Sequence, residues 1–244
     1  MIFYPTNWQE IGQPVAIQSI EAAIRMAVKR CGCYAVTLSG GIDSSLLLHY
    51  LASTGREVEA FTLGLSENHP DVVHARLMAS RYSNVTHHVY IPTADEMQRE
   101  AGKPGDLDGD ENVRLLYRFI GEHVSEAIAG DGIDEWACGY WKHIQAPTET
   151  TYVEFLRRLV PEQLEPLHRN SGNIFIHLPY LDRDVIHLLA QVPLADKTTT
   201  TCRKRIMVEL AHRAGIPTPI IERNKYGLCD ALRVKGNKCT LSTI

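Results

Sequence analysis

Residues 34–50 read YAVTLSGGIDSSLLLHY, and this stretch decides the fold. An apolar run is broken at Gly40 and Gly41 and resumes at once as a second apolar run. The first run, 34–38, has the length of a buried strand, and the second, 44–54, stops before Gly55 as a helix does. The pattern therefore predicts a strand that passes through a tight glycine loop directly into a helix.

The same alternation continues on both sides of this stretch. Helical spacing of apolar residues is found over 14–32, 70–82 and 113–124, and apolar strand patterns over 57–65, 84–92 and 125–130. Strands that alternate with helices indicate a parallel sheet with helices on its two faces. We therefore predict an α/β fold with an open parallel sheet flanked by helices.

The pattern changes after residue 148. Residues 150–169, 182–192 and 202–215 are all helix-like, with at most one short strand near 173–179. We therefore expect two parts: an α/β core over 1–148, and a mainly helical part over 149–244 that packs on the core and completes the site.

Composition excludes several classes of protein. The 244 residues carry a formal net charge of −4, which gives no overall attraction to nucleic acid. Every apolar stretch is too short to span a membrane, and the N-terminus MIFYPTNWQE has no signal-peptide pattern. The six cysteines form no C-x-x-C pair, so reduced thiols are expected. These features predict a cytoplasmic protein without a membrane or nucleic-acid partner.

The loop between the first strand and its helix has the chemistry of a phosphate site. Two glycines allow close approach of the backbone, the helix N-terminus carries partial positive charge, and Ser39, Ser44 and Ser45 add hydroxyl donors. Asp43 would repel phosphates unless it holds a Mg²⁺ that they share. The alternative is a capped turn with Asp43 or Ser44 as the N-cap.

A second polar loop, AGDGIDEWACGY at 129–140, follows the fourth strand. Asp131, Asp134 and Glu135 surround Gly132, and three acids are costly there unless a metal or a reacting amine compensates them. A solvated acidic turn is the alternative. Because carboxyl ends of parallel strands share one edge of the sheet, the two loops together favour a shared metal–phosphate site.

Four segments resemble one known family. LSGGIDSS at 38–45 matches the S-G-G-x-D-S loop of the N-type ATP pyrophosphatases. GDGIDEWACGY at 130–140, LPYLDRDVIHLL at 178–189 and the segment 204–227 resemble the synthetase domain of glutamine-hydrolysing asparagine synthetases. The resemblance implies a PP-loop fold of the adenine nucleotide alpha hydrolase type. It also implies an ATP-dependent, AMP-forming ligase that adenylates a carboxylate, releases pyrophosphate and transfers ammonia or an amine.

The resemblance also implies roles for individual residues. Asp43 and Asp134 would hold Mg²⁺, and Lys225, with Lys204 as a second candidate, would stabilise charge on the phosphates. Asp131 or Asp182 would take the proton of the attacking amine, although Asp182 also suits the N-cap of the helix 182–192. ATP and pyrophosphate are expected to contact Leu38, Ser39, Gly40, Gly41, Asp43, Ser44, Ser45, Gly64 and Gly132.

Some features depart from the family. Its glutaminase domain is missing here, so we expect free ammonia, an amine substrate or a separate glutaminase subunit as the nitrogen source. Asp131 stands where the family typically has Glu, and the aspartate-pocket pattern is absent from 105–119. Arg114 in that segment could grip a substrate carboxylate or be an ordinary surface cation. Alternative functions are adenylation of a nucleobase or tRNA, and nucleotide binding without catalysis.

Overall fold

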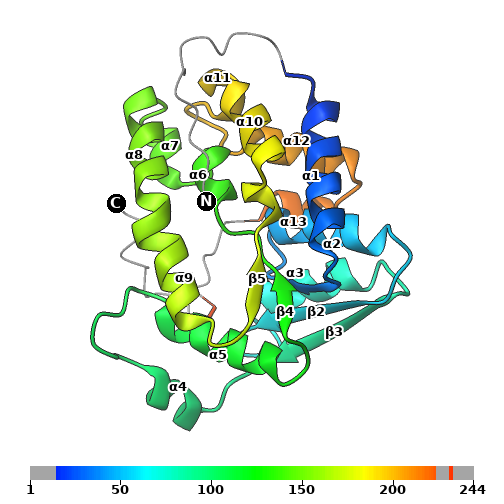
Figure 1. Cartoon of the computed structure of the whole chain (residues 1–244), viewed down its shortest axis with the longest axis vertical. Coiled ribbons are helices and arrows are strands. Elements are labelled where there is room, and N and C mark those ends of the chain that lie inside the picture. The colour runs from blue at the N-terminus through cyan, green and yellow to red at the C-terminus, as the bar shows by residue number, and fades with distance from the viewer. Residues whose placement is uncertain (1–14, 224–230, 233–244) are drawn as a thin grey trace.

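A computed structural model describes residues 15–223 and 231–232. Its centre is a five-stranded, all-parallel sheet with the order β3-β2-β1-β4-β5 (Figure 1). The strands are β1 Ala35–Thr37, β2 Val58–Leu63, β3 Val85–Tyr90, β4 Glu126–Ile128 and β5 Phe175–His177. The predicted open parallel sheet flanked by helices is therefore confirmed.

The first half of the chain alternates strands with helices: α1 Ile17–Cys31, α2 Ile42–Ala52, α3 Pro70–Ala79, α4 Ala94–Glu100 and α5 Asp110–Gly121. Local sequence signals set several helix ends. Gly32 ends α1 in the left-handed region with φ +67°. Thr93 and Glu96 form a capping box at the start of α4.

The second half contributes mainly helices: α6 Ile133–Trp136, α7 Trp141–Gln145, α8 Glu149–Leu159, α9 Glu165–Asn170, α10 Arg183–Gln191, α11 Leu194–Lys197, α12 Arg205–Arg213 and α13 Thr218–Ile221. A π-helical turn, η2 Val160–Leu164, joins α8 to α9, and a 3₁₀ turn, η3 Pro179–Leu181, follows β5. β5 itself comes from this half and pairs with β4, so one sheet unites both halves. The proposed boundary at residue 148 stays a prediction.

Helix α2 lies at the centre of the molecule. It is apolar on all sides, and all but three of its eleven residues are buried, including Leu46, Leu47 and Leu48 at 0% exposure. It contacts β1 and β2 on one side and α1, α3 and α12 on the others. A helix that is apolar all round needs such enclosure.

The strand order places the functional loops. From β1 the chain runs outward through β2 to β3, then returns across β1 to β4 and continues outward to β5. Between β1 and β4 the direction reverses, and in open α/β sheets ligands bind outside the carboxyl ends of the strands at such a switch point. The loops 38–41 and 129–132 leave β1 and β4 there. Among the described helices, none has the length and apolar character needed to cross a membrane.

Candidate active site

The loop after β1 is shaped by Gly40. This residue has φ +66°, and a Cβ placed on it would lie 2.5 Å from the backbone nitrogen of Ala75 in α3. Glycine is therefore required both for the left-handed backbone and for the contact with α3. Gly41 follows as the N-cap residue of α2 and has no capping side chain, so a ligand can approach the first backbone N–H groups of the helix.

Hydroxyl groups hold the loop in this conformation. Ser44 Oγ accepts the N–H of Ser39 at 3.2 Å, lies 3.2 Å from Ser39 Oγ, and donates to the carbonyl of Gly41 at 3.2 Å. Leu38 anchors the loop to β2 through a 2.7 Å bond from its N–H to the Phe61 carbonyl. Ser45 is fully buried, and its Oγ has no hydrogen-bond partner among the described residues.

The loop after β4 lies against the first loop. A Cβ on Gly130 would stand 3.6 Å from Cβ of Asp43, which is ordinary contact distance. Gly132 has φ +88° and packs on Leu181, leaving no room for a side chain. The buried Tyr180 hydroxyl donates to the carbonyl of Asp43 at 2.9 Å. The segment 178–182 thus packs against both loops, through Leu181 at Gly132 and Tyr180 at Asp43.

Lys204 joins the two loops electrostatically. Its Nζ donates to Oδ2 of Asp43 and lies 2.6 Å from Oδ1 of Asp134. The side chain is 7% exposed. Burial alone would lower the pKa of this ammonium, but the carboxylates of Asp134 and Asp43 outweigh burial and raise it. Lys204 is therefore a fixed positive charge between two predicted metal ligands.

Unusual backbone geometry places this lysine. Lys204 has φ +54° at the N-cap of α12, and Cys138 has φ +61°. The N–H of Lys204 donates to the carbonyl of Cys138 at 3.3 Å, so the two left-handed residues support each other. Gly139 completes the arrangement, because a Cβ there would lie 1.8 Å from Asp134 Oδ1 and 2.2 Å from Lys204 Cε.

The carboxylates of Asp43 and Asp134 fit a Mg²⁺ site. They approach the same ammonium group, and Oδ1 of Asp43 is buried without a hydrogen-bond partner in the described part of the chain. Oxygen ligands of this kind suit Mg²⁺, which is often held by one or two carboxylates together with substrate phosphates. Both residues would serve as the protein ligands.

Asp131 lies in an acidic and aromatic environment next to this cluster. Burial raises the pKa of Tyr140 and of Tyr117, and the charge of Asp131 adds to both shifts. The Tyr140 hydroxyl donates to Oε1 of the buried Glu135 at 2.6 Å. Asp131 is thus near the phenol of Tyr140 and the buried phenol of Tyr117 in α5.

Asp182 is occupied by other contacts. Its carboxylate accepts the N–H of Asp184 at 3.0 Å as the N-cap of α10 and pairs with Arg30 Nη2 at 2.6 Å. The structure therefore has the capping interaction that was one of the two interpretations of this residue.

The remaining predicted positions differ in how they are placed. Gly64 follows β2 and packs so closely on α3 that a Cβ would lie 2.4 Å from Val72 Cγ2. Lys225 lies outside the described residues. Arg114 is mostly buried and bonds Glu100, Asp106 and Asn170, so it ties the 101–109 segment to the fold.

Arg223 and Asp71 were missed by the sequence interpretation. Arg223 donates to the carbonyl of Ser39 at 3.0 Å and pairs with the buried carboxylate of Asp71 in the first turn of α3. It is the arginine of the R-x-K-x-G segment, two residues before Lys225. Its position in that motif is the sequence signal from which Arg223 could have been identified as a site residue.

Comparisons with known proteins agree with these motifs. The family model for asparagine synthase matches residues 17–177 and 171–242. A probable glutamine-hydrolysing asparagine synthetase of Schizosaccharomyces pombe is 25% identical over 296 residues, covering 97% of this chain and 53% of the relative. The chain thus spans about half the length of this curated relative.

Among solved structures, NMN synthetase from Francisella tularensis aligns with a TM-score of 0.49 and 15% identity, over 93% of this chain and 77% of that chain. The family match is the stronger finding, since it spans most of the chain and includes both loops of the site. The chain belongs to the asparagine synthase family.

Proposed function

We propose that the protein is an ATP-dependent, AMP-forming carbon–nitrogen ligase that makes an amide from a carboxylate and ammonia or an amine. One observation carries the proposal: the carboxylates of Asp43 and Asp134 and the ammonium of Lys204 converge where the pyrophosphate loop meets the loop after β4. Membership of the asparagine synthase family supports the same chemistry.

The first step is adenylation. A carboxylate oxygen of the substrate attacks the α-phosphorus of ATP, and the bond to the β-phosphate breaks with release of pyrophosphate. The loop backbone at Gly40 and Gly41, the hydroxyls of Ser39 and Ser44, and the N-terminus of α2 bind the leaving pyrophosphate. Mg²⁺ held by Asp43 and Asp134 would neutralise charge on the departing phosphates.

Lys204 contributes a positive charge that the carboxylates of Asp134 and Asp43 maintain against the effect of burial. A preorganised charge is effective because the protein does not reorganise during the reaction. Lys225 is proposed to act on the phosphates in the same way.

The second step forms the amide. The nitrogen attacks the acyl carbon, the carbon–oxygen bond to AMP breaks, and a base removes a proton from the nitrogen. We assign the base to Asp131, because Asp182 is engaged by Arg30 and by the N-terminus of α10.

Aspartate with ammonia is the first substrate pair to consider, and a specialised amide from another acid is the second. The nitrogen comes from free ammonia, from an amine or from a separate glutaminase subunit. Cys31, Cys33, Cys138 and Cys202 are free thiols, which supports the reducing cytoplasm as the location.

The test is pyrophosphate release from ATP·Mg²⁺, screened over aspartate and other carboxylates with and without ammonium. Asp134→Asn and Lys204→Gln should each lower the rate by about 10²-fold or more, the usual scale for losing one electrostatic contact. Asp184→Asn is the matched control, since its carboxylate is 66% exposed and its salt bridge is to Arg30. Release that needs no carboxylate, or that appears only with tRNA or a purine, would contradict the proposal.

A further inference from the structure

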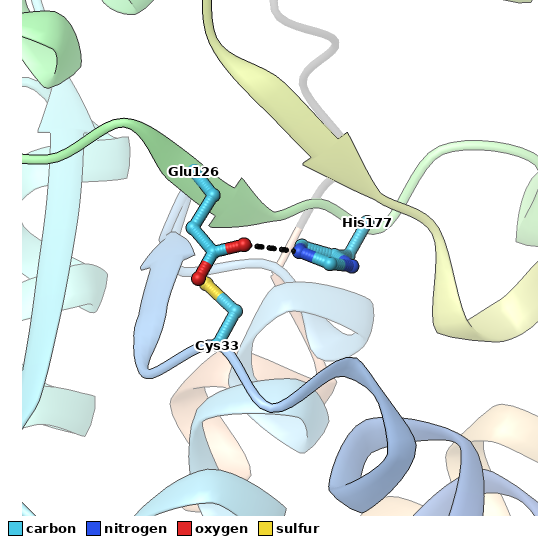
Figure 2. A group of neighbouring side chains, drawn as sticks. All are labelled: Cys33, Glu126 and His177. Carbon is cyan, nitrogen blue, oxygen red and sulfur yellow. Dashed lines mark hydrogen bonds and ion pairs between the residues drawn. The ribbon is translucent and has the colours of Figure 1, made fainter.

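A second cluster of metal-ligating side chains lies apart from the proposed active site. Cys33 precedes β1, Glu126 begins β4, and His177 ends β5. The Sγ of Cys33, a carboxylate oxygen of Glu126 and a ring nitrogen of His177 all lie within 4.8 Å of one another. Figure 2 shows the Glu126 carboxylate between the cysteine sulfur and the histidine ring. Cys33 and Glu126 are at the amino ends of their strands, whereas the pyrophosphate loop leaves the carboxyl end of β1.

We propose that Cys33, Glu126 and His177 form a binding site for a divalent cation of the zinc class. Thiolate, imidazole and carboxylate are ligands that zinc accepts together, whereas Mg²⁺ and Ca²⁺ require oxygen ligands. A thiolate and a carboxylate would also balance the two positive charges of the ion.

The spacing of the ligand atoms suits such an ion. In a tetrahedral zinc site with bonds of about 2.0–2.3 Å, the ligand atoms stand roughly 3.3–3.7 Å apart. His177 Nε2 is now 2.8 Å from Glu126 Oε2, so these two atoms would separate by less than ~1 Å as the ion enters. The other separations of up to 4.8 Å would contract by about the same amount.

The sulfur already has the backbone support typical of a thiolate ligand. The N–H of Ala35 donates to Cys33 Sγ at 3.4 Å, and such hydrogen bonds stabilise metal-bound sulfur. The Cys33 thiol also donates to the Ala35 carbonyl at 3.5 Å, and a bond to the metal would replace this one. Without a metal, burial raises the pKa of Cys33 to about 11, although bonds to the backbone of Ala35 and Ile128 partly oppose the shift. A bound cation would supply the charge that releases this proton.

The cluster is enclosed on one side and accessible on the other. Cys33 is 3% exposed, whereas the Glu126 side chain is 45% exposed. His177 also borders a shallow pocket of about 250 Å³ beside Cys31 and Leu178, and the exposed Glu126 side chain leaves the cluster open to solvent. Three protein ligands with one open position are a common zinc arrangement. A cation bound at this site would link β1, β4 and β5.

The experiment uses the full chain after chelation, titrated with Co²⁺ in place of Zn²⁺ under excess Mg²⁺, which keeps Co²⁺ from the oxygen site at Asp43 and Asp134. We expect one Co²⁺ per chain and a sulfur-to-cobalt charge-transfer band in the near ultraviolet. Cys33→Ser should abolish the band, and His177→Gln and Glu126→Gln should weaken Co²⁺ binding by 10-fold or more. Cys31→Ser, a cysteine beside the pocket, should keep the band.

Thermal unfolding gives an independent measurement. Zn²⁺ at about 100 times its dissociation constant should raise the Tm by roughly 5–10 °C, and the Glu126→Gln variant should lose most of this rise at the same concentration. The proposal is overturned if Co²⁺ produces no thiolate band, or if the band survives Cys33→Ser. Equal Tm shifts in the parent and in Glu126→Gln would also overturn it.

Discussion

Lys197 offers a quantitative test of the packing behind the acidic loop. It is 1% exposed, its Nζ donates to the Tyr152 hydroxyl at 2.5 Å, and burial lowers its pKa from 10.5 to about 7. Because the folded-state pKa is below the unfolded value, the unfolded chain binds more protons between pH 7 and 10.5. The free energy of unfolding therefore rises with pH across this window, and below pH 7 the folded state carries the full cost of a buried charge.

The magnitude follows from the size of the shift. A change from 10.5 to about 7 corresponds to roughly 5 kcal/mol at 1.36 kcal/mol per pKa unit. Lys197→Met keeps the volume and removes the charge, but it costs about 1–2 kcal/mol because the Tyr152 hydroxyl loses a partner. We expect the variant to be more stable than the parent by ~3 kcal/mol at pH 6.5, with the difference falling by ~1.4 kcal/mol per pH unit above pH 7.

Urea unfolding followed by the fluorescence of the buried Trp136 measures this difference at pH 6.5, 8 and 9.5. Near pH 9.5 the two proteins should be about equally stable. The exposed Lys29 provides the control, because Lys29→Met should change stability by the same small amount at each pH. A pH-independent difference for Lys197→Met, or a variant less stable than the parent at pH 6.5, would refute the reasoning.

Three further substitutions test the site and its support. Gly139→Ala should abolish pyrophosphate release, because the added methyl group would push Lys204 and Asp134 apart. Gly121→Ala, at the end of α5, should retain pyrophosphate release when it is measured in the same assay. Gly40→Ala should destabilise the fold by about 2–4 kcal/mol through backbone strain and overpacking, against about 1 kcal/mol for the open position Gly55→Ala in urea unfolding. Arg114→Met should cost about 1–3 kcal/mol, because Asp106 loses its ion pair and Glu100 keeps only Lys103 and Arg118, and limited proteolysis should then cut within 101–109.

The fold and part of the site could be predicted from the sequence for a simple reason. Parallel strands end at one edge of the sheet, so Asp43 and Asp134, which follow two of these strands, were expected at the same edge once the alternation of strands and helices was recognised. That the two strands are adjacent is known from the strand order. The glycines of these loops could also be recognised in the sequence, because they follow apolar runs that have the length of strands.

Lys204 and Arg223 could not be placed in this way. Lys204 is 161 residues from Asp43, and its position depends on a left-handed backbone at two residues that are not glycine. Nothing in local periodicity signals such a conformation. Asp182 was ambiguous because an acid before a helix suits both a cap and a catalytic base, and the capping bond from the Asp184 N–H and the contact with Arg30 are visible only in the structure.

The sheet order has a consequence for how the chain is synthesised. β4 pairs with β1 on one side and with β5 on the other, and β5 is encoded about 50 residues after β4. While the ribosome adds those residues, the outer edge of β4 has no strand beside it and is a site for misassociation. The Tyr180 contact with Asp43 also forms only after this delay. The nucleotide loop is therefore synthesised well before the residue that stabilises it. A nascent chain stalled before residue 180 would contain the binding motif without the Tyr180 contact.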